Sequence, residues 1–463
     1  MTVLLDTTDT RPVHFVGIAG AGMSGLAELL VRRGVAVQGT DSNPGGAPDL
    51  VRLGIAVHAH DAAFVRDARA VVYSSAVPQS HPELVTARAL GLPVIRRAEA
   101  LGEAVSGGTL IAVAGTHGKT TTTVMTTEAL AAAGFDPTGT AGGRVGAWGS
   151  NLRAGRTDLF VVEADEYDRS FLALTPTVAV VLNVEADHLD IYRDLDDINE
   201  TFVRFMQPAR ASVVCSDDAG AAALPQAVTR EVVRYAVDVP DAAGVPTARL
   251  IARAVEFNTR GSTSRLEFDG EAMGDLVLQV PGVHNVRNAL AALGAGLMIG
   301  ARIADMLPGL AAFAGVERRF QRIGDARDII VVDDYAHHPT EVAATIAAAR
   351  AAFPQQRLVV AFQPHLFSRT RDFADAFAQA LAGADVSFLC DIYPAREQPI
   401  DGVTSALIAD VMAAAGSAPQ WGGPRAACAA AIAAFARAGD VIITMGAGDI
   451  TLVGPEVLTT LRA

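Results

Sequence analysis

The clearest chemical signal in the chain is the segment 114–121, Ala-Gly-Thr-His-Gly-Lys-Thr-Thr, which lies between a predicted strand and a predicted helix. Glycine-rich loops in this setting wrap backbone N–H groups around phosphates, and they add a lysine for the β- and γ-phosphates and a hydroxyl for Mg²⁺. The loop is a shortened P-loop, because Val113 stands where the full motif has its first glycine. We therefore predict a nucleoside triphosphate site in which Lys119 meets phosphate and Thr120 meets the metal.

Lys119 is also the only lysine in a chain that has 37 lysines and arginines together. Lysine ends in a compact ammonium on a thin stem, whereas arginine ends in a broad planar fork. The single lysine favours a site that admits only the compact ion.

Two acidic segments follow predicted strands. The first, 163–168, reads Glu-Ala-Asp-Glu-Tyr-Asp, and its four carboxylates repel one another unless a cation lies between them. Glu163 stands at the expected strand end, which is a good position for a Mg²⁺ ligand. The pattern leaves open whether Asp165, Glu166 and Asp168 take part or form a solvated loop.

The second segment, 183–190, reads Asn-Val-Glu-Ala-Asp-His-Leu-Asp. His188 could bind a second metal, orient a phosphate or serve only the structure. It shares a predicted sheet edge with Glu163 and Lys119.

A second glycine-rich segment, 20–25, reads Gly-Ala-Gly-Met-Ser-Gly, and Asp41 closes the next predicted strand. This is the dinucleotide fingerprint, in which backbone N–H groups and a helix N-terminus hold a diphosphate. NAD would fit, and so would any other nucleotide diphosphate conjugate. The alternative is that the glycines only allow close packing of strand and helix.

Further polar residues gather in the last third of the chain. Four clusters, 333–341, 362–371, 391–397 and 446–449, each follow a predicted strand. Open α/β sheets bind ligands just beyond the carboxyl ends of their strands, so we predict a binding crevice there, with Arg369 as a clamp for a carboxylate. Earlier in the chain, His284, Asn285 and Asn288 open a predicted helix, where they could contact a nucleotide or cap the helix.

The elements that position these residues alternate between short apolar runs and Ala-rich helical stretches, which indicates an α/β fold with parallel sheets in three blocks. Predicted strands cover 13–17, 36–39, 71–74, 110–114, 159–163, 178–184, 329–333, 358–362, 386–389 and 441–444. Predicted helices cover 22–33, 119–133 and 284–298. Another begins after Pro339 and carries Val342, Ile346, Ala349 and Phe353 on one face, and a further helix carries Phe373, Phe377 and Leu381. The region 249–280 predicts a β-hairpin around 258–261.

Composition narrows the function classes. With 463 residues, two to four domains are expected. The net charge of −14 argues against a sequence-independent nucleic-acid binder, and no uncharged apolar run reaches the ~18 residues of a membrane helix. Three widely spaced cysteines argue against a disulfide framework. The N-terminus has no early basic cluster of the kind that opens a signal peptide. We therefore expect a cytoplasmic multidomain protein with no membrane or nucleic-acid partner.

Taken together, the motifs resemble those of the Mur ligase family. They are HFVGIAGAGMSGLAE, AGTHGKTTTT, EADEYDRSF, NVEADHLD, HNVRNALAA, GVERRFQ, VDDYAHHPTEV, FQPHLFSRT and GAGDI, and they run in this order from His14 to Ile450. GTHGKTTT is typical of the whole superfamily. DDYAHHPTE together with FQPH and SRT is typical of the branch that adds alanine and of its close relatives.

The resemblance implies three domains: an N-terminal Rossmann-like domain for a UDP-sugar at 1–107, a central P-loop ATPase with a mostly parallel sheet at 108–318, and a C-terminal Rossmann-like domain for an amino acid at 319–463. It implies an ADP-forming ligase that joins L-alanine to the lactyl carboxylate of UDP-N-acetylmuramate through an acyl phosphate, in peptidoglycan synthesis. ATP and Mg²⁺ would be the cofactors, and the enzyme would be a monomer or homodimer.

Residue by residue, the resemblance implies four groups of contacts. The catalytic residues would be Lys119, His188 and Arg369. The metal ligands would be Thr120, Glu163 and His188. ATP would contact Gly115, Thr116, His117, Gly118, Lys119, Thr120, Thr121, Asn288 and Arg319. The UDP-sugar would contact Gly20, Ala21, Gly22, Met23, Ser24 and Asp41. The amino acid would contact Tyr335, His337, His365 and Arg369.

One position departs from the family pattern. Some members have arginine where Leu366 stands, so any carboxylate contact there must come from Arg369. Several Mur ligases also carry a carbamylated lysine as a metal bridge, and this chain has no second lysine to play that part.

Three other functions stay open. An NAD-dependent dehydrogenase would explain only the first block. A ligase that attaches a whole tripeptide to the same UDP-sugar would fit the motifs about as well. An ATP-driven switch would bind ATP without ligating anything.

Overall fold

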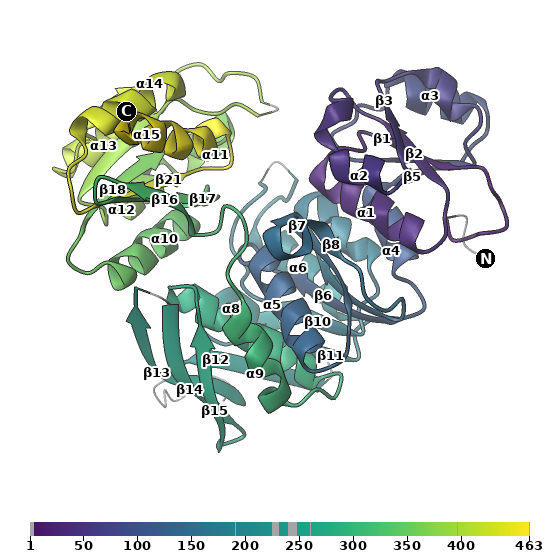
Figure 1. Ribbon diagram of the computed structural model, residues 1–463, viewed down its shortest axis with the longest axis horizontal. Coiled ribbons are helices and arrows are strands. Elements are labelled where there is room, and N and C mark those ends of the chain that lie inside the picture. Colours follow the sequence, from purple (N-terminus) through teal and green to yellow (C-terminus); the bar gives the residue numbers. More distant parts are fainter. Residues whose placement is uncertain are drawn as a thin grey trace. The chain divides into compact units, whose positions relative to one another are not determined.

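The computed structural model, drawn in Figure 1, describes residues 4–189, 191–224, 231–238, 248–259, 261–395 and 397–462. Contacts divide the chain into two compact units. Unit 1 comprises Met1–Ala254, Ser264–Leu276 and Val286–Phe313, and unit 2 comprises Val255–Thr263, Val277–Asn285 and Ala314–Ala463. Asp190, Arg260 and Arg396, which belong to segments singled out in the sequence, lie outside the described residues.

The first sheet of unit 1 has five parallel strands in the order β3-β2-β1-β4-β5. β1 and β4 are buried at every position, as expected for central parallel strands covered on both faces. The strands are β1 (Val13–Val16), β2 (Val37–Thr40), β3 (Ala56–His58), β4 (Ala70–Tyr73) and β5 (Val94–Arg96). The helices are α1 (Ala21–Arg32), α2 (Pro48–Arg52), α3 (Pro82–Ala89) and α4 (Arg97–Ala104), with 3₁₀ turns η1 (Pro44–Gly46) and η2 (Ala62–Val65).

The second sheet has the order β15-β14-β13-β12-β11-β10-β6-β9-β7-β8. Its strands are β6 (Thr109–Ala114), β7 (Thr138–Val145), β8 (Ser150–Arg153), β9 (Leu159–Glu163), β10 (Val178–Val181), β11 (Ala211–Cys215), β12 (Glu231–Val237), β13 (Leu250–Asn258), β14 (Gly261–Phe268) and β15 (Glu271–Leu278). Its helical segments are α5 (Lys119–Ala132), η3 (Gly146–Trp148), η4 (Tyr167–Ala173), α6 (Leu195–Met206), α7 (Ala219–Ala223), α8 (Val283–Leu297) and α9 (Ile303–Ala312).

In this sheet β10, β6 and β9 are neighbours and run parallel. The loops that follow these three strands therefore share one edge, which is the edge where the sequence places the P-loop and both acidic segments. β13 and β14 are also neighbours, which confirms the predicted hairpin.

The sheet of unit 2 has the order β16-β17-β21-β18-β19-β20, and every pair is parallel except β16 with β17. Its strands are β16 (Gln321–Ala326), β17 (Ile329–Asp334), β18 (Arg357–Phe362), β19 (Val386–Cys390), β20 (Trp421–Gly423) and β21 (Asp440–Met445). Its helical segments are α10 (Pro339–Ala352), α11 (Phe367–Asp372), α12 (Ala374–Leu381), α13 (Ala406–Ala414), α14 (Arg425–Phe435), η6 (Asp449–Leu452) and α15 (Val453–Arg462).

The predicted α/β class with mostly parallel sheets is confirmed, and two element predictions need correction. The strand expected over 178–184 ends at Val181, because the following residues turn to hydrogen-bond the P-loop. The single helix expected around Phe373 is two helices, α11 and α12, which meet at that residue. The domain boundaries at 107 and 318 stay predictions.

Apolar cores form separately in the two units. One large cluster fills unit 1 around Phe15, Phe160 and Phe202, and two clusters cover the two faces of the unit 2 sheet. Cys215, Cys390 and Cys428 are free and buried. Among the described residues, none of the helices combines the length and the apolar character needed to cross a bilayer.

Candidate active site

The predicted P-loop connects β6 to α5, so its residues meet the first turn of a 14-residue helix. Gly118 caps that helix with φ +83°, a left-handed conformation that favours glycine. A Cβ atom at Gly118 would also lie 2.7 Å from Asn288 Oδ1. Position 118 therefore needs glycine for two reasons, and Asn288 of α8 lies beside the P-loop, as predicted for a nucleotide contact.

Lys119 folds back onto its own loop. Its Nζ atom donates hydrogen bonds to the carbonyls of Gly115, at 2.8 Å, and Thr116, at 3.2 Å. It also meets the Glu166 carboxylate, at 2.9 Å from Oε1 and 2.8 Å from Oε2. The Lys119 side chain is only 15% exposed, so this ammonium is enclosed by carbonyl and carboxylate oxygens.

Glu166 is thus the partner of the single lysine, although the sequence left its role open. The signal that could have found it is its place three residues after a strand that neighbours the P-loop strand. Burial raises the pKa of Glu166 to about 7, against the opposing effect of Lys119. Burial alone would lower the pKa of Lys119, but Glu166, Asp165 and Glu163 outweigh it and raise that pKa above its ordinary value.

The predicted metal ligands Thr120 and Glu163 lie together. Thr120 Oγ1 donates to Glu163 Oε1 at 3.1 Å, and the other carboxylate oxygen accepts from the Gly142 N–H at 2.5 Å. A Cβ atom at Gly142 would lie 2.6 Å from Glu163 Oε1, so a larger residue there would displace this carboxylate. A hydroxyl beside a carboxylate is an oxygen pair that suits Mg²⁺, and these residues fit the predicted metal.

His188, the third predicted metal ligand, lies on the same edge. Its Nε2 atom is 3.7 Å from Glu166 Oε1 and 3.8 Å from Asp187 Oδ2, and its ring packs edge-on against Tyr167. Tyr192 donates from its hydroxyl to the Glu166 carbonyl at 2.6 Å. Glu166 therefore links Lys119 to His188.

Asn183 fixes the P-loop from the neighbouring strand β10. Its Oδ1 accepts from the His117 N–H at 2.7 Å, its Nδ2 donates to the His117 carbonyl at 3.1 Å, and its own carbonyl accepts from the Thr116 N–H at 3.1 Å. The Thr116 hydroxyl in turn accepts from the Glu185 N–H at 2.9 Å. These bonds set the loop conformation before any ligand arrives.

The predicted UDP-sugar loop joins β1 to α1, and Gly20 caps the helix. Asp41 Oδ2 accepts from the Ala19 N–H at 2.9 Å, so it holds the loop from the end of β2. Ser24 Oγ donates to the Ala21 carbonyl at 3.0 Å, and Met23 is buried in the core. The Met23 side chain is therefore part of the core rather than of a ligand-binding surface.

One pocket of unit 1 brings the UDP-sugar loop and the predicted metal ligand Glu163 together. It is lined by Ala21, Gly22, Gly25, Leu26, Arg97, Leu101, Thr140, Ala141, Gly142, Glu163 and Asp165. Arg97, at the start of α4, was missed by the sequence analysis, because nothing in its local pattern marks it. A Cβ atom at Gly22 would lie 2.8 Å from Arg97 Nη1, so glycine allows this arginine to approach the loop.

Unit 2 gathers the predicted amino-acid residues at the carboxyl edge of its sheet. The His337 ring lies between those of Tyr335 and His365, with centroid distances of 5.2 Å and 5.7 Å. Arg369, 6% exposed, lies in α11 with Nη1 3.4 Å from His365 Nδ1. Tyr393, which belongs to the predicted 391–397 cluster but not to the predicted amino-acid contacts, stacks on His365 at 5.9 Å.

Arg319 and Leu366 complete the predicted set in unit 2. The Arg319 guanidinium lies 5.2 Å from the centre of the Tyr335 ring, and its Nη1 is 3.5 Å from Glu341 Oε1. Leu366 caps α11 with φ +72° and is buried, so it positions the helix that carries Arg369. In α8, Asn285 Nδ2 donates to the Pro281 carbonyl at 2.7 Å, a local contact with the segment before the helix.

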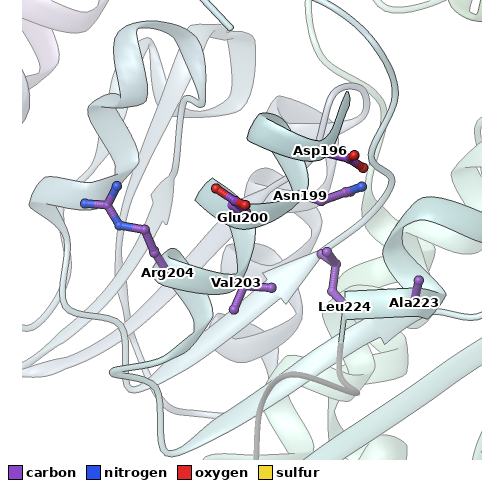
Figure 2. Close-up of a pocket in the computed structure, with 7 residues that line it drawn as sticks. All are labelled: Asp196, Asn199, Glu200, Val203, Arg204, Ala223 and Leu224. Atoms are coloured by element: carbon purple, nitrogen blue, oxygen red, sulfur yellow. The ribbon is translucent and has the colours of Figure 1, made fainter. Parts of the chain in front are cut away.

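A wide open pocket of about 730 Å³ lies between α6 and α7, as Figure 2 shows. It is lined by Asp196, Asn199, Glu200, Val203, Arg204, Ala223 and Leu224. None of these residues belongs to a predicted chemical motif. We therefore place the candidate active site at the P-loop edge.

Comparisons with known proteins agree with this placement. The Mur ligase family catalytic domain matches residues 12–109, the Mur ligase middle domain residues 113–296, and the Mur ligase glutamate ligase domain residues 318–448. The UDP-N-acetylmuramate–L-alanine ligase of Streptomyces coelicolor is 44% identical over 99% of both chains. The enzyme of the same name from Mycobacterium tuberculosis is 44% identical over 98% of this chain and 95% of its own.

Solved structures give the same result. A UDP-N-acetylmuramate–alanine ligase from Thermotoga maritima matches with a TM-score of 0.81 at 27% identity, over 97% of this chain and 99% of its own. A murein peptide ligase from Psychrobacter arcticus matches with a TM-score of 0.70 at 27% identity, over 97% of this chain and 98% of its own. The chain belongs to the Mur ligase family.

Proposed function

We propose that this chain is an ATP-dependent ligase that joins L-alanine to the lactyl carboxylate of UDP-N-acetylmuramate and releases ADP and phosphate, in peptidoglycan precursor synthesis. One observation of the structure carries the proposal. The loop after β1, which suits a nucleotide diphosphate, lines the same pocket as Glu163, which pairs with Thr120 of the P-loop. An acceptor held by that loop would therefore present its far end to the phosphates of ATP.

The chemistry has two steps. A carboxylate oxygen of the sugar attacks the γ-phosphorus of ATP, the bond to the β-phosphate oxygen breaks, and ADP leaves an acyl phosphate behind. The amine of L-alanine then attacks the acyl carbon, the resulting tetrahedral intermediate expels phosphate, and the nitrogen loses a proton. Both reactants of the first step are anionic, so charge neutralisation is the main task of the site.

The residues of unit 1 suit that task. Lys119 already holds its ammonium inside the P-loop, and the phosphates of ATP would replace the Glu166 carboxylate as its partner. Arg97 offers a second cation to the acidic sugar nucleotide. We propose Thr120, Glu163 and His188 as the residues that hold Mg²⁺, which when bound supplies further positive charge to the phosphates.

The residues of unit 2 suit an amino acid. Arg369 is a fork that can pair with a carboxylate through two N–H groups. His365 contacts Arg369 directly. The rings of His337 and Tyr393 contact His365, and the ring of Tyr335 contacts His337. We propose that Arg369 holds the L-alanine carboxylate, with His337 and His365 as further contacts, and that Asn288 and Arg319 contact the nucleotide.

The names of the relatives point to two different acceptors, so the assay compares L-alanine with a peptide. The relatives at 44% identity are named for L-alanine, whereas the Psychrobacter arcticus protein at 27% is named for a peptide. We expect ADP release from ATP and UDP-N-acetylmuramate to depend on L-alanine, and we expect Lys119→Ala to abolish it. Release that depends instead on L-Ala-γ-D-Glu-meso-diaminopimelate would assign the chain to tripeptide ligation. Binding of ATP without acceptor-dependent release would leave a switch.

The cellular location and the oligomeric state of the enzyme are two further proposals. We propose that the enzyme works in the cytoplasm, which suits its free buried thiols and its nucleotide substrates. We propose that it is a monomer or a homodimer, which the molar mass in solution would test.

A further inference from the structure

A buried carboxylate surrounded by histidines lies in unit 1 among residues that the proposed reaction does not use. Glu83 is 1% exposed. Its Oε2 atom accepts from Thr40 Oγ1 at 2.7 Å and lies 2.8 Å from His14 Nε2, while its Oε1 atom lies 3.0 Å from His60 Nδ1. His81 lies close by, with its ring centre 4.8 Å from that of His60. Glu83 therefore has a histidine at each oxygen and a further imidazole nearby.

The parallel sheet explains why these residues meet. His14 lies on β1 and Thr40 ends β2, while His60 lies just beyond β3 and His81 caps α3, which begins beyond β4. Because β3, β2, β1 and β4 are consecutive neighbours, the carboxyl ends of β2, β3 and β4 bring Thr40, His60 and His81 to one place, and His14 reaches Glu83 from within β1. The cluster is thus built by the sheet rather than by one flexible loop.

The donor set suits a transition metal. One ring nitrogen of His60, one of His81 and one carboxylate oxygen of Glu83 all lie within 4.8 Å of one another. Zn²⁺ binds imidazole nitrogen and carboxylate oxygen at about 2.0–2.2 Å, which places neighbouring ligand atoms roughly 3.4 Å apart. Small rotations of the partly exposed His60 and His81 rings would bring the ligand atoms from within 4.8 Å of one another to the separation that Zn²⁺ requires. Imidazole is a preferred ligand of Zn²⁺, Co²⁺ and Ni²⁺, whereas Mg²⁺ and Ca²⁺ prefer oxygen.

The cluster also has an exposed side and a supported carboxylate. The His60 side chain is 33% exposed, while Glu83 is enclosed. Hydrogen bonds that orient a metal-binding carboxylate are usual in metal sites, and Thr40 and His14 already hold the other oxygen of Glu83.

We propose that His60, His81 and Glu83 form a binding site for a divalent transition-metal ion of the Zn²⁺ class, distinct from the Mg²⁺ site at the P-loop. The ion would take the place of the proton between His60 Nδ1 and Glu83 Oε1, so binding releases a proton when that nitrogen is protonated. Water would complete the coordination. The ion would join the segment after β3 to the first turn of α3.

The test uses the full chain, stripped of metal and then kept in millimolar Mg²⁺ so that oxygen-rich sites are filled. Co²⁺ is titrated as the probe, because its visible absorption reports ligation by nitrogen, and bound Zn²⁺ is counted after gel filtration. We expect one high-affinity equivalent in the wild-type protein. His81→Asn and His60→Asn should each lower the affinity at least about 10-fold.

The substitutions are chosen so that folding is preserved. The His81 side chain accepts from the Glu83 N–H at the start of α3, and asparagine is a good helix N-cap that can keep this role. His58→Asn is the matched control, because His58 lies two residues from His60 but stacks on Phe64 at 4.2 Å. It should bind as the wild type does.

His188→Asn separates this site from the P-loop edge. Zn²⁺ uptake should persist in that variant. Added Zn²⁺ should raise the thermal midpoint of the wild-type protein but not that of His81→Asn. The proposal is overturned if the wild-type chain takes up no ion, if His81→Asn and His60→Asn bind as tightly as wild type, or if His188→Asn alone abolishes uptake.

Discussion

Lys119 is the residue whose type matters most, because its ammonium fits among two carbonyls and one carboxylate. Arginine would keep the charge but would need space for a planar fork in a site where the side chain is only 15% exposed. We expect Lys119→Arg to fold normally and to lower kcat for ADP release about 100-fold or more, a typical loss when a group that stabilises transition-state charge is displaced.

The control for this substitution is the reverse exchange at an exposed position. Arg302 is 80% exposed and pairs with Asp305 at the start of its own helix. Arg302→Lys should keep wild-type kcat, which would show that the assay tolerates exchange of the two cations in general. A Lys119→Arg variant with near wild-type kcat would contradict the role given to the compact ammonium.

Asp334, at the end of β17, is a residue whose environment predicts a pH effect. It accepts from the N–H groups of Phe320, at 2.6 Å, and Ala336, at 2.7 Å, and burial raises its pKa to about 6. A carboxyl whose pKa is higher in the folded state contributes stability below its ordinary pKa of 3.8, and this contribution is lost as the pH rises toward 6.

Asp334→Asn cannot titrate, so the difference in stability between wild type and variant should shrink as the pH rises from about 4 to about 7. The shift corresponds to at most about 3 kcal/mol. Asparagine also loses one of the two acceptors, which adds an offset that does not change with pH. Thermal midpoints of both proteins across this range measure the effect. A constant difference would contradict the raised pKa.

At the scale of elements, the P-loop depends on its neighbour β10. Asn183 follows that strand and makes two side-chain hydrogen bonds to His117. Loss of both bonds should loosen the loop without unfolding α5. We expect Asn183→Ala to raise the Kd for ATP about 10-fold, since each buried hydrogen bond contributes about 1 kcal/mol. Calorimetric titration with a non-hydrolysable ATP analogue measures it.

Asn183→Asp is the matched variant. An ionised aspartate keeps the acceptor for the His117 N–H, but it turns an oxygen toward the His117 carbonyl and adds a negative charge beside the phosphate loop. Its Kd should therefore be at least as high as that of Asn183→Ala. Equal affinity of all three proteins would mean that the strand does not fix the loop.

The same elements illustrate what a sequence can predict. The central apolar strands, the glycine loops and the face of α10 formed by Val342, Ile346 and Ala349 were all predicted correctly, because burial and backbone geometry leave a periodic signal. The pairing of Glu166 with Lys119 was left open, since it depends on which strands become neighbours in the sheet. Arg97 was missed because its place beside the glycine-rich loop depends on the fold rather than on its local pattern. The roles of the predicted site residues stay predictions until variants are assayed.

At the scale of the whole molecule, the two units have separate apolar cores, which predicts separate unfolding transitions. Leu110 of β6 belongs to the unit 1 core and Leu358 of β18 to the unit 2 core, and both are buried. Replacing either by alanine removes buried methyl groups and should cost about 2–5 kcal/mol in its own unit. Scanning calorimetry should show Leu110→Ala lowering one transition and Leu358→Ala the other.

The same two variants also show which unit binds UDP. UDP, which shares its diphosphate with the proposed sugar substrate, should raise only the transition that Leu110→Ala lowers, because a ligand stabilises the fold that binds it. If UDP instead raised the transition that Leu358→Ala lowers, the sugar nucleotide would bind in unit 2 and the pocket shared by Gly22 and Glu163 would lose its proposed role. If both variants lowered one common transition equally, the two units would unfold together as one cooperative body.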